Sequence, residues 1–545
     1  MVVRRRGFLG LAGFGALGAA IAWQQALASA DDRARADDFD PTERSIAELQ
    51  AALGGPLTSA ALVSAHLARI ARLDAAGPAY RSVLAVNPDA LAAARALDAE
   101  RRAGKLRGPL HGIPILIKDN IATRDPLPTT AGSLALARAF HGADAPLVAR
   151  LRAAGAVVLG KTNLSEWANF RSTRSNSGWS AVGGQTGNAY DVSRNPSGSS
   201  SGSGTAAALS LCAAAVGTET DGSILSPAAV NGLVGFKPSL GVVSGAGIVP
   251  LSPRQDVAGP MARSVADARA LAEAMCEPMR LRSGASATTA RALRIGLVPE
   301  PANLRVEVAA RYRAARDAWR DLGAEVVDAP LPPTIAEAGD PEFTALLYEF
   351  KAALDAYLGA LAPGMTEAST LTALIEFNRR NADRELPLFG QEILEMAVAK
   401  GPLTEQAYLD AVAALRRLVE TEGLEPMFRD LRLDALVAPG AGPAALIDPL
   451  LGDRRESNGP PLGSAAAIAG YPSITLPMGL AKGMPVGMTV VAPRHADLAL
   501  LDIAARFERE GAFRVPPRVH RQPHAVTNVP WLQGDLSLAH DSLRA

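Results

Sequence analysis

The sequence predicts an α/β fold in which helices cover both faces of a central sheet. Short apolar runs alternate with helix-patterned segments from about residue 108 to 300, and the alternation resumes from 432 to 510. Runs of this kind are typical of strands that are buried on both faces by the helices between them. The stretch 301–431 is rich in Ala, Leu and Arg and has few strand signals, which predicts a mainly helical insert carried by the sheet.

Each element is predicted from its own periodicity. Runs of aliphatic residues predict strands at 113–117, 156–160, 232–236, 294–297, 435–439 and 486–493. Apolar residues at three- and four-residue spacing predict helices at 45–72, 88–102, 147–155, 204–215, 264–278 and 498–509. Thr58 and Ser59 are a predicted N-cap inside the first helical region, because a hydroxyl at that place accepts a free N–H of the helix start.

The first thirty residues predict an export signal. Three arginines at 4–6 precede a Gly/Ala-rich apolar run, and small residues follow at 28–30. A basic start, an apolar run and a small-residue cleavage site predict a twin-arginine signal peptide over 1–30. The protein is then expected to be periplasmic or secreted, with no stable membrane association after signal removal. The alternative is an uncleaved anchor over 8–27, which the glycines and paired glutamines in that run disfavour.

Composition shifts divide the chain into six segments. They are the signal peptide (1–30), a flexible lead-in (31–44), the first part of the α/β core (45–300), the helical insert (301–431), the return to the core (432–510) and a C-terminal tail (511–545). The lead-in is polar, and the tail is rich in Pro, Arg and His without clear periodicity.

The overall composition argues against a nucleic-acid partner. Apolar residues make up 48% of the chain and charged residues 20%, as in a globular soluble protein. Lys plus Arg and Asp plus Glu each number 55, so no net charge attracts nucleic acid or anionic lipid. Aromatic residues are 5%, which leaves little surface for stacking on single-stranded bases.

Neither cysteine nor histidine spacing predicts a metal site. Cys212 and Cys276 lie in apolar, helix-like runs and form no CxxC or Cys/His arrangement. The two thiols are either buried and free or joined in a disulfide, and the sequence does not decide between these states. The seven histidines show no HExxH spacing, and no cofactor is expected.

Ser223 ends a Thr-Asp-Gly-Ser turn that favours nucleophilic chemistry. Gly222 permits a backbone conformation that other residues resist, and successive N–H groups in such a turn can converge on a developing oxyanion. A serine at the end of the turn is placed to attack a carbonyl held by the same N–H groups. The alternative is an ordinary turn in which Ser223 caps a helix beginning near Pro227.

Lys118 is a candidate base for a serine nucleophile. It closes the apolar run 113–117, and burial disfavours the ammonium form, which lowers the pKa toward neutrality. A neutral amine can then take the proton of a serine hydroxyl. Ser199, Ser200 and Ser201 lie in a Gly/Ser-rich loop that also suggests phosphate binding, but no GxxxxGK[ST] pattern accompanies it.

Together these motifs resemble the amidase signature family. The resemblance rests on GPLHGIPILIKDNI around Lys118, PSGSSSGSG around Ser199 and GTETDGSILSPAAVNGLVGFKPS around Ser223. The two serines are 24 residues apart, which agrees with that family. Four further matches follow in order at 155–169, 259–267, 434–440 and 469–479, so the likeness covers about 45–510. The resemblance implies a three-layer α/β/α sandwich around a large mixed, twisted sheet, with the helical insert shaping the substrate pocket.

The resemblance also implies the roles of the site residues. Ser223 is implied as nucleophile, Lys118 as general base, and Ser199, after a cis peptide at Gly198, as the relay between them. The reaction passes through an acyl-enzyme that water hydrolyses, without metal or cofactor. The implied oxyanion hole consists of the backbone N–H groups of Thr220, Asp221, Gly222 and Ser223.

One departure from the family pattern bears on the substrate. Many members have Gly-Gly-Ser at the nucleophile turn, whereas this chain has Asp221-Gly222-Ser223 and resembles the peptide amidase branch, which removes ammonia from C-terminal peptide amides. Asp221 is a candidate substrate contact, with a local turn cap as the alternative. Aryl, fatty acyl or other small amides are alternative substrates. The signature is also compatible with a non-catalytic periplasmic binding protein. A tRNA-dependent amidotransferase subunit shares it too, but the export signal and the zero net charge argue against that function.

Overall fold

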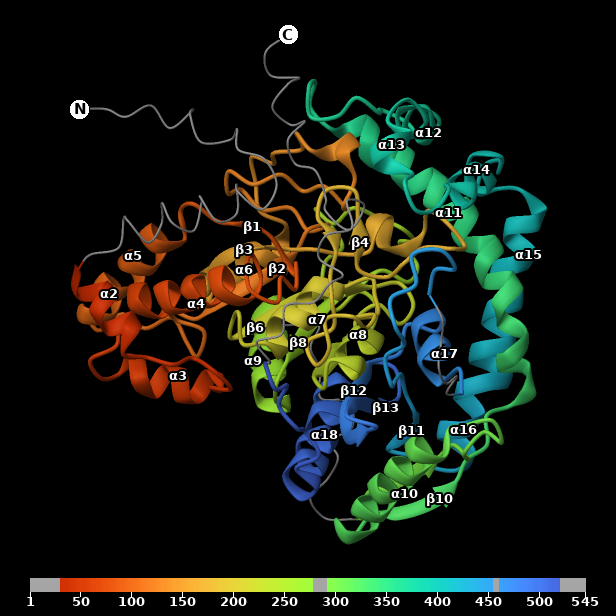
Figure 1. The fold of residues 1–545 in the computed structure, drawn as a ribbon. Coiled ribbons are helices and arrows are strands. Elements are labelled where there is room, and N and C mark those ends of the chain that lie inside the picture. The colour runs from red at the N-terminus through yellow and green to blue at the C-terminus, as the bar shows by residue number, and fades with distance from the viewer. Residues whose placement is uncertain (1–29, 278–291, 454–459, 520–545) are drawn as a thin grey trace.

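One mixed sheet of eleven strands runs through the molecule (Figure 1), in a computed structural model that describes residues 30–277, 292–453 and 460–519. The strands lie in the order β1-β3-β2-β6-β8-β7-β12-β13-β11-β9-β10. Their bounds are β1 (Val83–Val86), β2 (Pro114–Lys118), β3 (Val157–Thr162), β6 (Ala214–Glu219), β7 (Val234–Lys237), β8 (Val257–Ala262), β9 (Arg294–Leu297), β10 (Glu325–Asp328), β11 (Ala435–Pro439), β12 (Ser473–Ala481) and β13 (Met484–Val491). A separate two-stranded sheet pairs β4 (Trp179–Ser180) with β5 (Gly184–Gln185).

Parallel and antiparallel pairs both occur in the large sheet. β2 is parallel to β3 and β6, and β9 is parallel to β10 and β11. The pairs that connect these two groups, through β8, β7, β12 and β13, are antiparallel. The predicted mixed sheet is therefore confirmed, and β2 lies inside the sheet with neighbours on both sides.

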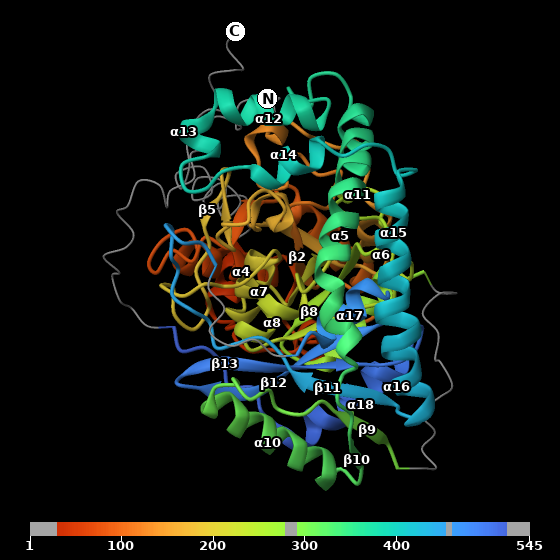
Figure 2. The same ribbon diagram turned by 90° about the vertical axis from the view of Figure 1, so that its right-hand side faces the viewer.

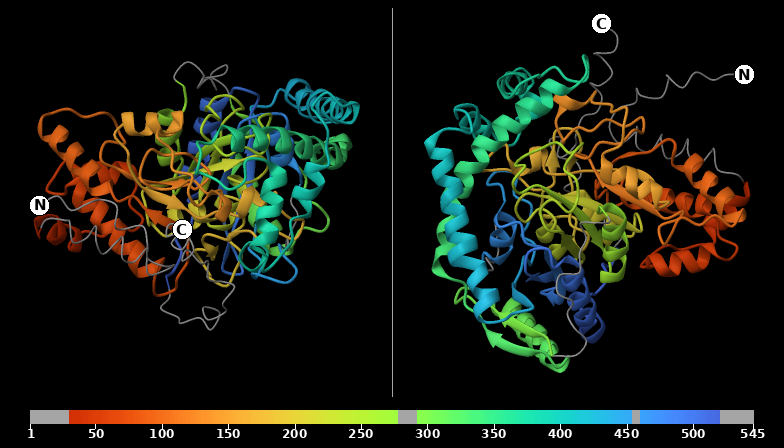
Figure 3. Two further views of the ribbon diagram at one scale, coloured as in Figure 1. Left: turned by 90° about the horizontal axis from the view of Figure 1, so that it is seen from above. Right: turned by 180° about the vertical axis from the view of Figure 1, so that it is seen from behind.

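Helices cover both faces of the sheet because alternate strand residues point in opposite directions. In β2, Ile115 and Ile117 join one buried apolar cluster, whereas Leu116 joins another. The helices that contribute mainly to the first cluster are α3 (Ile46–Leu53), α6 (Pro146–Ala153), α9 (Val265–Met275), α10 (Val306–Asp321) and α18 (Asp497–Gly511). Those of the second are α4 (Ser59–Leu73), α5 (Ala90–Arg102), α7 (Ser201–Ala208) and α8 (Leu225–Val230). Figure 3 gives two further views of the same fold, from above and from behind.

Two helix starts follow their local signals. Ser45 and Glu48 form a capping box at the start of α3. The Thr58 hydroxyl accepts the N–H of Ala61 at the start of α4, which confirms the predicted N-cap. These contacts satisfy N–H groups that would otherwise lack a partner in the first turn.

The helical insert lies along one side of the sheet, where Figure 2 shows its two long helices α11 and α15 side by side. Its elements are the 3₁₀-helix η3 (Pro333–Ala338), α11 (Gly339–Ala360), α12 (Leu371–Arg380), α13 (Ala382–Glu385), α14 (Glu392–Val398), α15 (Gln406–Leu415), the π-helix η4 (Arg416–Leu424) and α16 (Glu425–Asp430). The start of the predicted insert needs correction. Residues 306–328 form α10 and β10, and β10 pairs in parallel with β9 at the sheet edge, so the insert proper follows β10.

Two local predictions are wrong, and one strand was not predicted. The lead-in 31–44 is not simply flexible, because α2 (Ala30–Asp37) begins there and the Thr58 hydroxyl donates to Asp32 over 3.0 Å. The helix predicted over 204–215 ends at Ala208, and β6 begins at Ala214 between β2 and β8. Pairing on both sides overrides the helix propensity of alanine there. The sequence does not predict β8, because glycine and proline are unfavourable inside strands and both occur in it.

Some sequence predictions fall wholly or partly outside the described residues. The predicted signal peptide occupies 1–29 and the first described residue, Ala30, and most of the tail lies beyond 519. The described start of the tail contacts the body, where Arg514 donates to the Gly232 carbonyl over 3.0 Å. Among the described residues, no helix combines the length and apolarity needed to cross a bilayer. Cys212 and Cys276 are both buried and free.

Candidate active site

Lys118 is fully buried at the end of β2. Its Nζ lies 2.8 Å from Ser199 Oγ and 2.8 Å from Thr218 Oγ1, and it donates a longer bond of 3.3 Å to the Thr218 carbonyl. Asn120 donates to the same Thr218 hydroxyl over 3.0 Å. The amine is therefore held by hydroxyl and carbonyl oxygens, with no carboxylate in direct contact among the described residues.

Burial sets the protonation of this amine. Removal from water lowers the pKa of Lys118 to about 7, while the negative charges of Asp256 and Glu219 act in the opposite direction. Desolvation is the larger effect because neither carboxylate pairs with Nζ directly. A substantial fraction of the side chain is then uncharged at neutral pH, as a general base requires.

Ser199 lies in the Gly/Ser-rich loop that leads into α7. The peptide between Gly198 and Ser199 is cis, and the Ser199 carbonyl accepts the N–H of Ser165 over 3.0 Å. A Cβ on Gly198 would lie 2.2 Å from Ser165 Oγ and 3.0 Å from Ser177 Oγ, so only glycine fits at this point. The loop is thus packed tightly enough to fix the position of the Ser199 hydroxyl beside the lysine.

Ser223 lies on the turn that follows β6. Gly222 has φ +72°, a left-handed conformation that favours glycine, as the sequence indicates. The buried Glu219 carboxylate accepts the N–H groups of Ile224 and Leu225 over 2.7 and 3.0 Å, and this anchors the end of the turn. The N–H groups of Gly222 and Ser223 have no hydrogen-bond acceptor among the described residues. The turn therefore offers donors to a ligand. The N-cap position of α8 is Ile224, not Ser223.

The turn and the Ser-rich loop meet at Ser223. The Ser200 N–H donates to the Ser223 carbonyl over 3.2 Å, and Ser199 and Ser223 are both buried. No hydrogen bond between the Ser199 and Ser223 hydroxyls is recorded in the described part of the chain. The structure thus joins Lys118 to Ser199 directly and brings Ser223 to the same loop through backbone contact.

A cavity of about 570 Å³ opens in front of the turn. Its wall includes Ser223 but neither Ser199 nor Lys118, so the serine faces the open space and the amine lies behind it. The other predicted turn residues, Thr220, Asp221 and Gly222, also line it. Apolar wall residues come from the core and from the insert, including Phe170, Leu251 and Leu346. This places the Ser223 hydroxyl, unpaired N–H donors and an apolar surface around one space.

A second layer of polar residues supports the turn from behind. The Thr220 hydroxyl donates to Asp256 over 2.6 Å, and the Gln255 amide lies 3.3 Å from the Thr220 carbonyl. Glu342 of α11 accepts from Gln255 over 2.8 Å, and burial together with the charge of Asp221 raises the pKa of Glu342 to about 8. Sequence reasoning missed these residues, because nothing in the local pattern of 255–256 or 342 connects them with a turn far away in the chain.

No group of His, Cys, Asp and Glu within the described ranges is arranged to hold a metal ion. The polar side chains around the cavity instead satisfy one another and the backbone. Asp453, for example, accepts from Ser177 N over 2.8 Å and from Asn195 over 2.7 Å. The site brings together the Ser223 hydroxyl, the buried Lys118 amine and unpaired backbone N–H donors.

Comparison with known proteins identifies the family of this chain. The family model described as Amidase matches residues 61–501. A protein of Arabidopsis thaliana named as a probable amidase is 37% identical over 508 residues, covering 88% of this chain and 92% of that protein. A glutamyl-tRNA(Gln) amidotransferase component of Salinispora arenicola is 36% identical over 527 residues, covering 88% of this chain and 99% of that protein.

Solved structures give the same result. The native peptide amidase of Stenotrophomonas maltophilia is 46% identical with a TM-score of 0.81, covering 88% of this chain and 99% of that one. An amidase family protein of Bacillus anthracis is 31% identical with a TM-score of 0.80, covering 92% of this chain and 97% of that one. The match to the family model, these relatives and the shared sheet architecture show that this chain is an amide hydrolase of the amidase signature family.

Proposed function

We propose that this amidase hydrolyses C-terminal peptide amides with a Ser-Ser-Lys triad of Ser223, Ser199 and Lys118. The observation that carries the triad is the 2.8 Å contact between the buried Lys118 Nζ and Ser199 Oγ, behind a serine that faces the cavity. Two other features support it: the pKa of Lys118 lies near neutrality, and unpaired N–H groups lie on the nucleophile turn.

The reaction divides into two half-reactions. Neutral Lys118 takes the proton of Ser199, which takes that of Ser223, while Ser223 Oγ attacks the amide carbon. The oxyanion binds to the turn N–H groups, the C–N bond breaks, and ammonia leaves with the returned proton. Water then attacks the acyl-enzyme by the same proton route, which releases the carboxylic acid and restores Ser223. The donors proposed for the oxyanion are the backbone N–H groups of Thr220, Asp221, Gly222 and Ser223.

Two features support a peptide amide as substrate. The similar enzyme of Stenotrophomonas maltophilia is a peptide amidase, and another structure of peptide amidase at 46% identity holds the competitive inhibitor chymostatin. In this chain, Asp221 lines the cavity on the nucleophile turn and is exposed there, so its carboxylate can accept an N–H of the substrate.

We further propose that the enzyme is exported by the twin-arginine route and acts in the periplasm or outside the cell.

An ammonia-release screen tests the substrate class. Purified enzyme is compared on C-terminal peptide amides, aryl amides, long-chain amides, asparagine and glutamine, at equal concentrations. The highest kcat/KM is expected for peptide amides. A higher kcat/KM for aryl or long-chain amides would replace the peptide assignment, and release from none of them would favour a binding protein.

The pH dependence tests the protonation of Lys118. Because burial lowers its pKa to about 7, the ammonium form predominates below that pH and the amine above it. Only the amine accepts a proton, so kcat/KM is expected to rise with pH and to level off above an apparent pKa of about 7. Rates measured from about pH 5 to about pH 9 at constant ionic strength show this directly.

Other buried groups titrate in the same range and need a control. The pKa of Glu342 is raised to about 8, and Glu342 supports the turn through Gln255. Glu342→Gln removes that titration, and the rise near pH 7 is expected to remain. A flat profile between pH 6 and 8, or a rise that disappears in Glu342→Gln, contradicts the assignment of the rise to Lys118.

Asp221→Asn tests the proposed substrate contact. Losing a charged acceptor to a substrate N–H is expected to lower kcat/KM on peptide amides about 10- to 100-fold. Glu342→Gln is the matched control, since it changes a nearby carboxyl that lies outside the cavity wall and, with a pKa of about 8, is largely protonated already. An unchanged kcat/KM in Asp221→Asn would mean that the Asp221 carboxylate does not contact the substrate and has only a local role in the turn.

A further inference from the structure

A second cavity of about 240 Å³ lies between the helical insert and the core. α15 and η4 form one wall, and the chain after α17 (Leu462–Ile468), the loop after β13 and the loop before β8 form the others. None of the residues that line it also lines the catalytic cavity. The proposed reaction leaves this cavity without a role.

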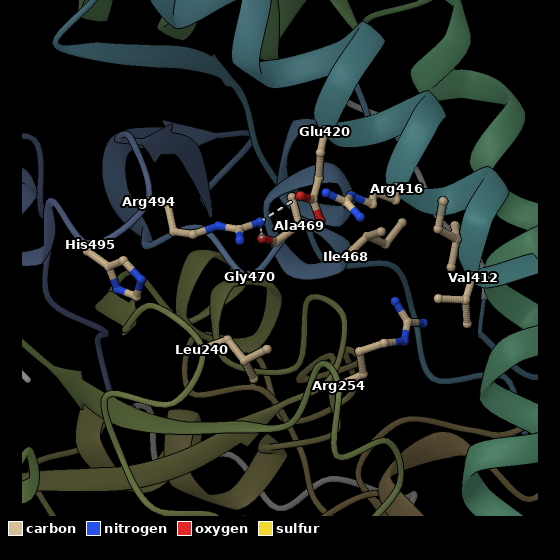
Figure 4. Close-up of a pocket in the computed structure, with 11 residues that line it drawn as sticks. Leu240, Arg254, Val412, Arg416, Glu420, Ile468, Ala469, Gly470, Arg494 and His495 are labelled. Carbon is tan, nitrogen blue, oxygen red and sulfur yellow. Dashed lines mark hydrogen bonds and ion pairs between the residues drawn. The ribbon is translucent and has the colours of Figure 1, made fainter. Parts of the chain in front are cut away.

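Basic side chains dominate its polar surface. Arg254, Arg416, Arg494 and His495 line it, against Glu420 as the acidic side chain in its wall. Figure 4 shows Arg494 and Arg416 pointing toward one another on either side of Glu420, with Arg254 on the opposite wall. Guanidinium groups from three separate segments therefore converge on one small space.

Two of the three arginines already have carboxylate partners. Arg494 lies 2.9 Å from Glu420 and also donates to the Ala469 carbonyl over 2.6 Å. Arg254 lies 2.8 Å from Glu349 of α11. These contacts hold both guanidinium groups in place and neutralise their charges.

Arg416 carries the charge that remains. It is exposed toward the cavity, and no hydrogen bond or ion pair to its guanidinium is recorded among the residues that the structure describes. It begins the π-helix η4, which also carries Glu420. Helices of this rare type occur frequently at functional sites. The cavity thus has about one uncompensated positive charge, on the Arg416 guanidinium. A guanidinium group is planar and can bind a carboxylate through two parallel hydrogen bonds.

The rest of the wall is apolar. Leu240, Val412, Leu415 and Ile468 face the same space as the guanidinium groups. A ligand with a single negative charge and a compact apolar body matches both surfaces. A doubly charged phosphate would be matched less well, because it would bring a second negative charge close to Glu420.

We propose that this cavity binds a small carboxylate with an apolar body, and that Arg416 holds the carboxylate beside Arg494.

The segment 252–256 connects this site with the nucleophile turn. Arg254 lines the cavity, and its neighbours Gln255 and Asp256 contact the Thr220 carbonyl and hydroxyl. Binding does not require the catalytic cavity, so the inference stands apart from the proposed substrate.

Calorimetry with benzoate on the full-length enzyme tests the site, with inorganic phosphate and benzyl alcohol as comparison ligands. Saturable benzoate binding is expected, weakened by added salt, with weaker binding of phosphate and of the uncharged alcohol. Arg416→Gln is expected to weaken benzoate binding about tenfold or more, because a hydrogen-bonded charge is lost. Arg416→Lys keeps the positive charge but lacks the planar guanidinium. Its affinity for benzoate is expected to lie between those of the wild type and Arg416→Gln.

Arg417→Gln is the matched control. Arg417 is the next residue of the same helix, is exposed, and pairs with Glu422 over 2.9 Å outside the cavity. This variant is expected to bind benzoate as the wild type does, and amide hydrolysis without benzoate is expected to be unchanged in all three variants. The proposal is overturned if the wild type shows no saturable binding, if Arg416→Gln binds as tightly as Arg417→Gln, or if phosphate binds more tightly than benzoate. Inhibition by benzoate that is competitive with the amide and unchanged in Arg416→Gln would place the carboxylate in the catalytic cavity instead.

Discussion

Replacing Ser223 by alanine is expected to lower kcat for amide hydrolysis about 10⁴- to 10⁶-fold, since no acyl-enzyme can form without the hydroxyl. Ser223 is only 7% exposed and its side chain makes no recorded hydrogen bond within the described residues, so the fold is expected to tolerate the change. A fluorophosphonate probe is expected to label the wild type and to leave Ser223→Ala unlabelled. Ammonia release and labelling together measure the reaction and the nucleophile separately.

Ser226→Ala is the matched control for this experiment. Ser226 lines the same cavity three residues further along, and its hydroxyl lies 2.7 Å from that of Ser197. Its loss is expected to change kcat less than tenfold and to leave labelling intact. Labelling that persists in Ser223→Ala, with activity close to that of the wild type, would assign the nucleophile to another residue.

The second large effect is expected for Lys118→Met. A positioned general base contributes about 10²- to 10⁴-fold to a rate, and methionine fills a similar volume without accepting a proton. The melting temperature is expected to change little, because the variant no longer has to bury an amine. Residual activity is expected to lose the rise near pH 7 that the wild type shows.

Lys118→Arg separates a base from a fixed positive charge. Arginine can donate to the oxygens of Ser199 and Thr218 but does not give up its proton at accessible pH. If Lys118 acts as a base, this variant is expected to be as inactive as Lys118→Met while it remains folded. Activity near the wild-type level in Lys118→Arg would mean that the lysine acts as a cation, and the proposed proton transfer would then be wrong.

Much of the fold was predictable from patterns within short segments. The run 435–439 predicts a strand and is one, and the strands predicted at 113–117 and 156–160 lie within two residues of β2 and β3. Aliphatic runs buried on both faces carry this signal by themselves. The prediction failed over 204–215, where alanine favours a helix but two neighbouring strands offer hydrogen bonds to the backbone of β6.

The candidate site also has residues that local sequence patterns predict and residues that they do not. Lys118 was recognisable from its place at the end of an apolar strand within the motif GPLHGIPILIKDNI, since Lys161 and Lys237 follow apolar runs too. The Gly222–Ser223 turn was recognisable from its glycine, because these signals are local. Thr218 and Asp256 were not recognisable. Thr218 touches Lys118 only because β2 and β6 are neighbours in the sheet, and Asp256 reaches Thr220 only through the loop before β8.

The sequence by itself determined which groups can react in this protein: hydroxyls on glycine turns, a lysine at the end of an apolar strand, and the motifs of an amidase. Only the tertiary structure decided how these groups act on one another. It buries the Lys118 amine, which moves its pKa to about 7, and it brings Arg254, Arg416 and Arg494 from three distant segments to the second cavity. The physical reason is that desolvation and charge pairing depend on distances across the folded chain, whereas turn geometry and strand character depend on neighbouring residues.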